Sequence, residues 1–65
     1  MQTVATNIST APIRVVVIED ERELRTGLQV LLNMTPNFEC VKSFGSMEEA
    51  LRTSDIETAD LVLTD

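Results

Sequence analysis

A near-continuous run of apolar residues at positions 13–18 constrains the fold of this chain more than any other feature. Pro12 precedes the run, and the acidic residues Glu19, Asp20 and Glu21 follow it. A strand that is apolar at almost every position is typical of a parallel sheet covered by helices on both faces. The run therefore predicts the central strand of an α/β fold, and this strand ends at a group of carboxylates.

A helical pattern follows the acidic residues. Its leucines recur at positions i, i+4, i+7 and i+8, namely Leu24, Leu28, Leu31 and Leu32, which predicts one apolar stripe. Asp20 is the expected N-cap, and Pro36 ends the helix because it cannot continue the hydrogen-bond pattern. Gly27 lies within the stripe, where we expect it to allow close approach to the sheet.

The second half of the chain predicts two further strands around a short helix. Residues 38–44 form a strand in which Phe38, Cys40 and Phe44 share one parity, and its charged residues indicate a place near the sheet edge. Ser46 and Glu49 match a capping box at the start of the short helix. Residues 54–59 are expected to form a connecting loop, and residues 60–65 a third strand that stops on an Asp.

This order of elements, strand-helix-strand-helix-strand, predicts the strand order 2-1-3, as in a doubly wound sheet whose complete order is 2-1-3-4-5. The carboxyl ends of the first and third strands are neighbours in that order. Glu19, Asp20 and Asp65 are therefore expected to face one crevice at this edge. Clustered carboxylates recruit a cation, and Mg²⁺ binds one or two carboxylates while it keeps several waters. The Asp65 carboxylate, beside such a metal, can act as a nucleophile toward a phosphoryl group.

Composition and charge exclude several other classes of function. The net charge of -6, from 11 acidic and 5 basic residues, disfavours a nucleic-acid-binding face. No His is present, and the lone Cys40 cannot form an internal disulfide, which favours a reducing cytoplasm. No apolar run is long enough to cross a membrane. Residues 1–12 are polar and lack periodicity, so we expect a flexible leader before a domain at 13–65.

Three segments carry a family resemblance: Val15 to Glu21 in the first strand, Leu24-Arg25 in the helix that follows, and Asp60 to Asp65 in the third strand. In these segments the chain resembles the receiver domain of two-component response regulators. The resemblance implies a flavodoxin-like fold, Mg²⁺ held by Glu19, Asp20 and Asp65, and transfer of a phosphoryl group from a sensor histidine kinase to Asp65. It implies a cytoplasmic regulator rather than an enzyme. DNA binding would come only through an output domain that these residues do not contain.

The resemblance covers only the N-terminal half of a receiver domain. The Ser or Thr after the fourth strand and the Lys after the fifth strand, which the family requires, are not in this sequence. The expectation is therefore half of a phosphoacceptor site, truncated at Asp65. One alternative is a short, non-catalytic protein that competes for a kinase through the first helix, beside Arg22 and Arg25, or the remnant of a truncated gene. A metal-dependent nuclease or topoisomerase-like fold is disfavoured, because no Gly follows Glu19 and the chain is acidic.

Overall fold

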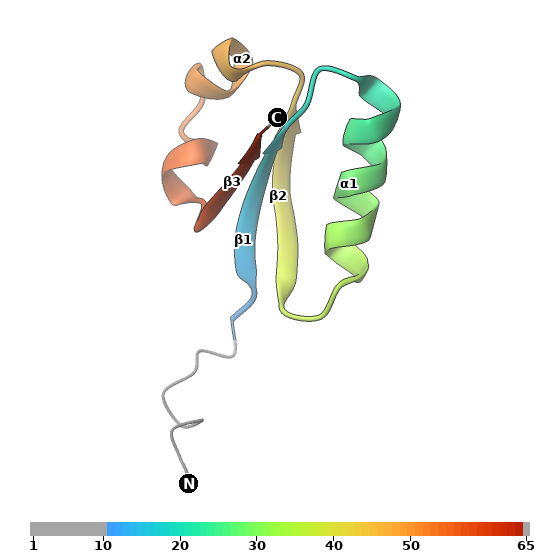
Figure 1. The fold of residues 1–65 in the computed structure, drawn as a ribbon. Coiled ribbons are helices and arrows are strands. Elements are labelled where there is room, and N and C mark those ends of the chain that lie inside the picture. Colours follow the sequence, from blue (N-terminus) through green and yellow to red (C-terminus); the bar gives the residue numbers. More distant parts are fainter. Residues whose placement is uncertain (1–10, 65) are drawn as a thin grey trace, which may run out of the picture.

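The computed structural model describes residues 11–64 of the chain (Figure 1). The elements follow one another as β1 (Ile13–Ile18), α1 (Arg22–Met34), β2 (Phe38–Phe44), α2 (Met47–Leu51), the 3₁₀ helix η2 (Asp55–Thr58) and β3 (Leu61–Thr64). All three predicted strands and both predicted helices are present. Asp65 and most of the predicted leader, residues 1–10, lie outside the described residues.

The three strands form one parallel sheet in the order β2-β1-β3, with β1 in the centre (Figure 1). β1 pairs with β3 from Val15 opposite Leu61 to Ile18 opposite Thr64. This order confirms the predicted α/β fold class, because it is the order at the start of a flavodoxin-like sheet. Within residues 11–64, β1 is the strand with a neighbour on each side and a packed cluster on each face, as its nearly continuous apolar sequence predicts.

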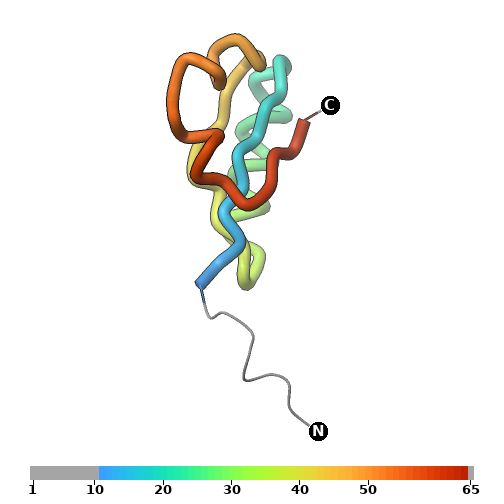
Figure 2. Tube along the Cα trace, turned by 90° about the vertical axis from the view of Figure 1, so that its left-hand side faces the viewer, coloured from blue at the N-terminus to red at the C-terminus, as the bar shows by residue number. Residues whose placement is uncertain are grey.

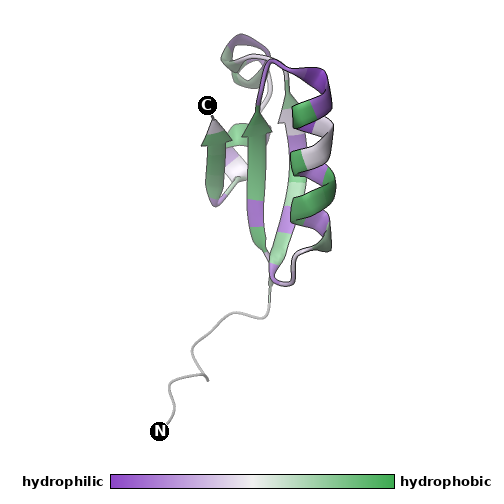
Figure 3. Cartoon of the chain, turned by 45° about the vertical axis from the view of Figure 1, so that its right-hand side comes forward, coloured by the Kyte–Doolittle hydropathy of each residue, from purple (hydrophilic) through white to green (hydrophobic). Residues whose placement is uncertain are grey.

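Two layers cover the sheet, α1 on one face and the α2–η2 segment on the other (Figure 2). The cluster under α1 contains Val15, Val17, Cys40, Leu28, Leu32 and Phe38. The cluster on the opposite face contains Val16, Ile18, Phe44, Ala50, Val41, Ile56, Ala59 and Val62. Figure 3 shows hydrophobic residues along most of β1 and β3. Burial of each fully covered valine of β1 contributes about 1.5–3 kcal/mol, so this strand dominates the core.

The predicted alternation along β2 is wrong in its second half. Val15 pairs with Cys40 but Val16 pairs with Lys42, so the pairing skips Val41 and the register shifts by one residue. An extra residue of this kind reverses the alternation of faces beyond it. Cys40 therefore packs under α1, whereas Phe44 packs on the opposite face with α2. The Asn33 side-chain oxygen accepts the Cys40 N–H at 2.9 Å beside this irregularity.

Two expectations for the Leu stripe of α1 are also wrong. Leu28 and Leu32 pack on the sheet as predicted, but Leu24 and Leu31 are exposed and do not belong to the core. A Cβ added at Gly27 would meet no atom within 4 Å, so this glycine does not permit a close approach. The helix covers β1 and β2 along a narrower stripe than the sequence predicts.

The segment between α2 and β3 is more ordered than the predicted loop. Ser46 caps α2 as expected, because its hydroxyl oxygen accepts the Glu49 N–H at 3.2 Å. The following residues form η2 instead of an irregular loop, and Ile56 packs against the buried cluster on that face. Asp60 then joins β3 to β1 twice: its N–H donates to the Arg14 carbonyl oxygen at 2.8 Å, and its carboxylate accepts the Arg14 N–H at 2.9 Å. These two bonds fix the register of β3 beside β1.

Candidate functional site

The carboxyl ends of β1 and β3 meet at one edge of the sheet, as the sequence predicts. Ile18 pairs with Thr64, so Glu19 is the first residue beyond the pairing in β1. A shallow pocket of about 280 Å³ lies at this edge, lined by Ile18, Glu19, Asp20, Gly45, Ser46 and Thr64. The candidate site therefore combines the loop after β1, the loop after β2 and the end of β3.

Glu19 is the most firmly held residue of the site. It is only 7% exposed, and one carboxylate oxygen accepts the Glu21 N–H at 3.0 Å. Its own N–H donates to the Phe44 carbonyl oxygen at 3.0 Å, and its carbonyl oxygen accepts Nη1 of Arg25 at 2.8 Å. These bonds fix both the backbone and the carboxylate of Glu19 before any ligand arrives.

Asp20 is exposed, in contrast to Glu19, and lines the same pocket. The prediction that Asp20 caps α1 is wrong, because Glu21 is the N-cap and α1 has no side-chain cap. The Glu19 carboxylate instead binds the Glu21 N–H from the preceding strand end. Within residues 11–64, the Asp20 carboxylate accepts no hydrogen bond, so it is free to bind a ligand in the pocket.

The donor set of this pocket fits a hard divalent cation. Glu19 and Asp20 supply two carboxylates from consecutive positions, and Mg²⁺ is commonly bound by one or two carboxylates with waters in its remaining positions. The described residues contain no group of three or more His, Cys, Asp or Glu that could hold a metal. Asp65, the predicted third ligand and phosphoacceptor, lies outside these residues and follows Thr64 in the sequence.

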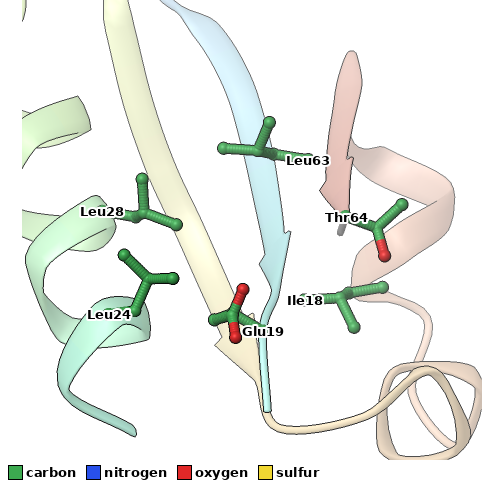
Figure 4. Close-up of a pocket in the computed structure, with 6 residues that line it drawn as sticks. All are labelled: Ile18, Glu19, Leu24, Leu28, Leu63 and Thr64. Carbon is green, nitrogen blue, oxygen red and sulfur yellow. The ribbon is translucent and has the colours of Figure 1, made fainter. Parts of the chain in front are cut away.

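A second pocket of about 280 Å³ lies on the α1 side of the sheet, next to the first (Figure 4). Four of its six lining residues are apolar (Figure 4). The lining residues are Ile18, Glu19, Leu24, Leu28, Leu63 and Thr64. Ile18, Glu19 and Thr64 line both pockets, so Glu19 lies at the boundary between an acidic and an apolar surface. The sequence pattern did not predict this apolar pocket, because Leu63 and Leu24 come from elements far apart in the chain.

Three residues that shape the acidic pocket were also not predicted as site residues: Arg25, Gly45 and Ser46. Ser46 was identified only as a helix cap, and it also lines the pocket. The Gly-Ser pair after β2 was the available signal, because a turn at the carboxyl end of a strand beside β1 must approach the acidic loop. No short motif relates Arg25 to Gly45, which lies twenty positions later.

Comparisons with other proteins add no assignment. No helix within residues 11–64 has the length and apolar character needed to cross a membrane. No family model, no curated protein and no solved structure matches this chain significantly. What the fold supports is a small α/β domain built on a three-stranded parallel sheet of order 2-1-3.

Proposed function

We propose that this chain carries the acidic part of a phosphoacceptor site in a response-regulator receiver domain. Asp65 accepts the phosphoryl group, and Glu19, Asp20 and Asp65 bind Mg²⁺. The observation that carries the proposal is the pairing of Ile18 with Thr64 in a parallel sheet. Because the acidic pair follows Ile18 and Asp65 follows Thr64 in the sequence, the three carboxylates belong to the ends of two adjacent strands.

The chemistry of the proposed transfer divides among these residues. An oxygen of the Asp65 carboxylate attacks the phosphorus of a phosphohistidine, the new P–O bond forms, and the P–N bond to the kinase imidazole breaks. Mg²⁺ held by these carboxylates would neutralise charge on the transferred phosphoryl group. Glu19 contributes a carboxylate already oriented by the Glu21 N–H, and Asp20 contributes one without a hydrogen-bond partner among the described residues.

The partner in this proposal is a sensor histidine kinase, and the domain acts as a cytoplasmic regulator rather than an enzyme. The net charge of -6 suits a basic docking surface on that partner. Any contact with DNA would belong to an output domain outside this sequence.

The first test is a Mg²⁺ titration monitored by the amide NMR shifts of residues 19–21. The shifts should saturate in the wild-type chain. The Mg²⁺ affinity should be at least tenfold weaker in Asp20→Asn, because this change removes a charged ligand. Asp60→Asn is the matched control at the opposite end of β3, since an amide oxygen still accepts the Arg14 N–H. Equal Mg²⁺ affinity in Asp20→Asn and wild type would contradict the proposed metal site.

The second test is phosphoryl transfer from acetyl phosphate, measured by intact mass. Any labelling of the chain should require Mg²⁺ and should disappear in Asp65→Asn but persist in Asp60→Asn. Strong Mg²⁺-dependent labelling that survives Asp65→Asn would refute Asp65 as the phosphoacceptor. The two Asp→Asn changes alter charge equally, so a difference between them reports position rather than net charge.

A second candidate function, kinase binding without phosphoryl transfer, is favoured by the exposed apolar residues of α1. Leu31 is 61% exposed and Met34 is 77% exposed, and residues three positions apart are neighbours on a helix surface, so these two side chains present an exposed apolar surface on α1. If α1 is a docking surface, Leu31→Glu should abolish capture of a histidine kinase in the absence of Mg²⁺. Leu51→Glu, at a residue of α2 that is 66% exposed, is the matched control. No capture by the wild-type chain at high micromolar concentration would exclude this candidate.

A further inference from the structure

Arg25 connects α1 to the acidic loop across six positions of the chain. Its Nη1 atom donates a hydrogen bond of 2.8 Å to the carbonyl oxygen of Glu19, the residue at which β1 ends. The side chain is partly buried, whereas the other arginine of the first turn, Arg22, is exposed and makes no side-chain hydrogen bond within residues 11–64. The guanidinium therefore holds the backbone of Glu19, a residue that lines the acidic pocket.

The same guanidinium lies against the loop after β2. A Cβ added at Gly45 would lie 3.3 Å from Arg25 Nη1, which is tighter than an ordinary van der Waals contact, and 3.7 Å from a Glu49 carboxylate oxygen. Gly45 does not have a positive φ, so its backbone conformation is one that other residues adopt. A larger side chain at this position would therefore meet the Arg25 guanidinium, which would have to shift by a few tenths of an ångström.

The other contacts of Gly45 fix its side of the pocket. Its N–H donates to the Glu49 carboxylate at 3.1 Å, and Glu49 in turn donates its N–H to the Ser46 hydroxyl. The loop after β2 is thus anchored to α2, while the loop after β1 is anchored to α1 through Arg25. The acidic pocket lies between these two loops, with Glu19 and Asp20 on one side and Gly45 and Ser46 on the other.

We propose that Arg25 is a positioning residue, which holds the Glu19–Asp20 loop against Gly45 and thereby sets the geometry of the two carboxylates for a divalent cation. This inference rests on the proposed function, in which Glu19 and Asp20 bind Mg²⁺. Arg25 acts through the Glu19 backbone and through the space at Gly45, and it does not itself touch the cation.

The direction in which the Mg²⁺ affinity changes when Arg25 is removed distinguishes a positioning role from a purely electrostatic one. A guanidinium near a cation site repels the cation, so its removal for charge reasons alone would tighten Mg²⁺ binding. If Arg25 orients the carboxylate loop, its removal must weaken Mg²⁺ binding in spite of the lost repulsion. Residues that orient metal ligands typically change affinity by about 10–100-fold.

The experiment compares four variants of the 65-residue chain by Mg²⁺ titration, with the amide shift of Asp20 as the signal. Arg25→Ala should weaken binding by about tenfold because it removes the guanidinium, and Gly45→Ala should weaken it less because the added Cβ only displaces the flexible end of Arg25. Arg25→Lys should recover part of the affinity, since an ammonium can still donate to the Glu19 carbonyl oxygen. Arg22→Ala, the matched charge control, should bind Mg²⁺ as tightly as wild type or more tightly.

A metal-free measurement keeps this inference separable from the proposed function. Hydrogen exchange of the Glu21 amide, which donates to the Glu19 carboxylate, should accelerate in Arg25→Ala and Gly45→Ala but not in Arg22→Ala. Unchanged Glu21 exchange in Arg25→Ala would overturn the inference, as would Mg²⁺ affinity equal to or above that of wild type. If wild-type chain binds no Mg²⁺, the proposed function fails, and the exchange rates alone then decide the role of Arg25.

Discussion

Substitution of the central valine Val16 by alanine offers the sharpest test of the packing that supports the site. Val16 is fully buried in the cluster on the α2 side of the sheet. The change removes two methyl groups, worth about 1.6 kcal/mol of transfer free energy, and the cavity that remains adds about 1 kcal/mol. We therefore expect Val16→Ala to lower the free energy of unfolding by about 2–3 kcal/mol. A domain of this size has only about 3–10 kcal/mol in total, so the loss is large.

The assay is urea unfolding followed by far-ultraviolet circular dichroism, because the chain has no Trp or Tyr for fluorescence. With a slope of about 1 kcal/mol per molar urea, the midpoint of Val16→Ala should fall by about 2 M or more. Val30→Ala is the matched control, since Val30 is 52% exposed on α1 and the same two methyl groups are removed. Its effect should stay within about 0.5 kcal/mol. Equal midpoint shifts in the two variants would refute the reasoning.

Three further outcomes follow from individual hydrogen bonds and from one buried thiol. Ser46→Ala should cost about 1 kcal/mol in urea unfolding because it removes the acceptor for the Glu49 N–H, and Ser46→Asp should retain most of that stability. Asn33→Ala should cost about 1–3 kcal/mol because the Cys40 N–H loses its acceptor, whereas Asn33→Asp keeps an acceptor oxygen and should cost less. Burial raises the pKa of the Cys40 thiol, so the folded chain retains this proton to higher pH than the unfolded chain. Stability should therefore fall as the pH rises past the pKa of an unfolded cysteine, and urea midpoints of Cys40→Ala should fall less over the same alkaline range.

The strands were predictable from the sequence because their signals are local and strong. The run of β-branched residues in β1 requires cover on both faces, and the bounds of β1 and β2 agree with the prediction. The strand order 2-1-3 followed from the alternation of strands and helices, and the meeting of Glu19 with the end of β3 followed from that order. The roles of Asp20 and Asp65 in phosphoryl transfer stay predictions.

Of the details that sequence reasoning missed, one depends on a local hydrogen bond and the others on contacts between distant segments. The start of α1 was placed one residue early because the Glu19 carboxylate, from the strand end, binds the Glu21 N–H in place of an Asp20 cap. The second half of β2 was assigned to the wrong face because the register shift at Val41 is invisible in a pattern of period two. Arg25 was interpreted as part of a docking helix, since nothing local in the sequence links it to Gly45.

The skipped residue in β2 divides the strand into two segments in which the alternation of faces is opposite. Residues before Val41 and residues after it obey opposite rules for which side chains are buried, and Asn33 anchors the strand at Cys40, beside the change of phase. Deletion of Val41 would leave Ser43 and Phe44 opposite Val17 and Ile18 and on their present faces, and it would remove one side chain from the cluster on the α2 side. Deletion of Ser43 would instead keep the skipped residue and turn Phe44 away from that cluster toward α1. A change of length by one residue is therefore tolerated at the skipped position and not beyond it.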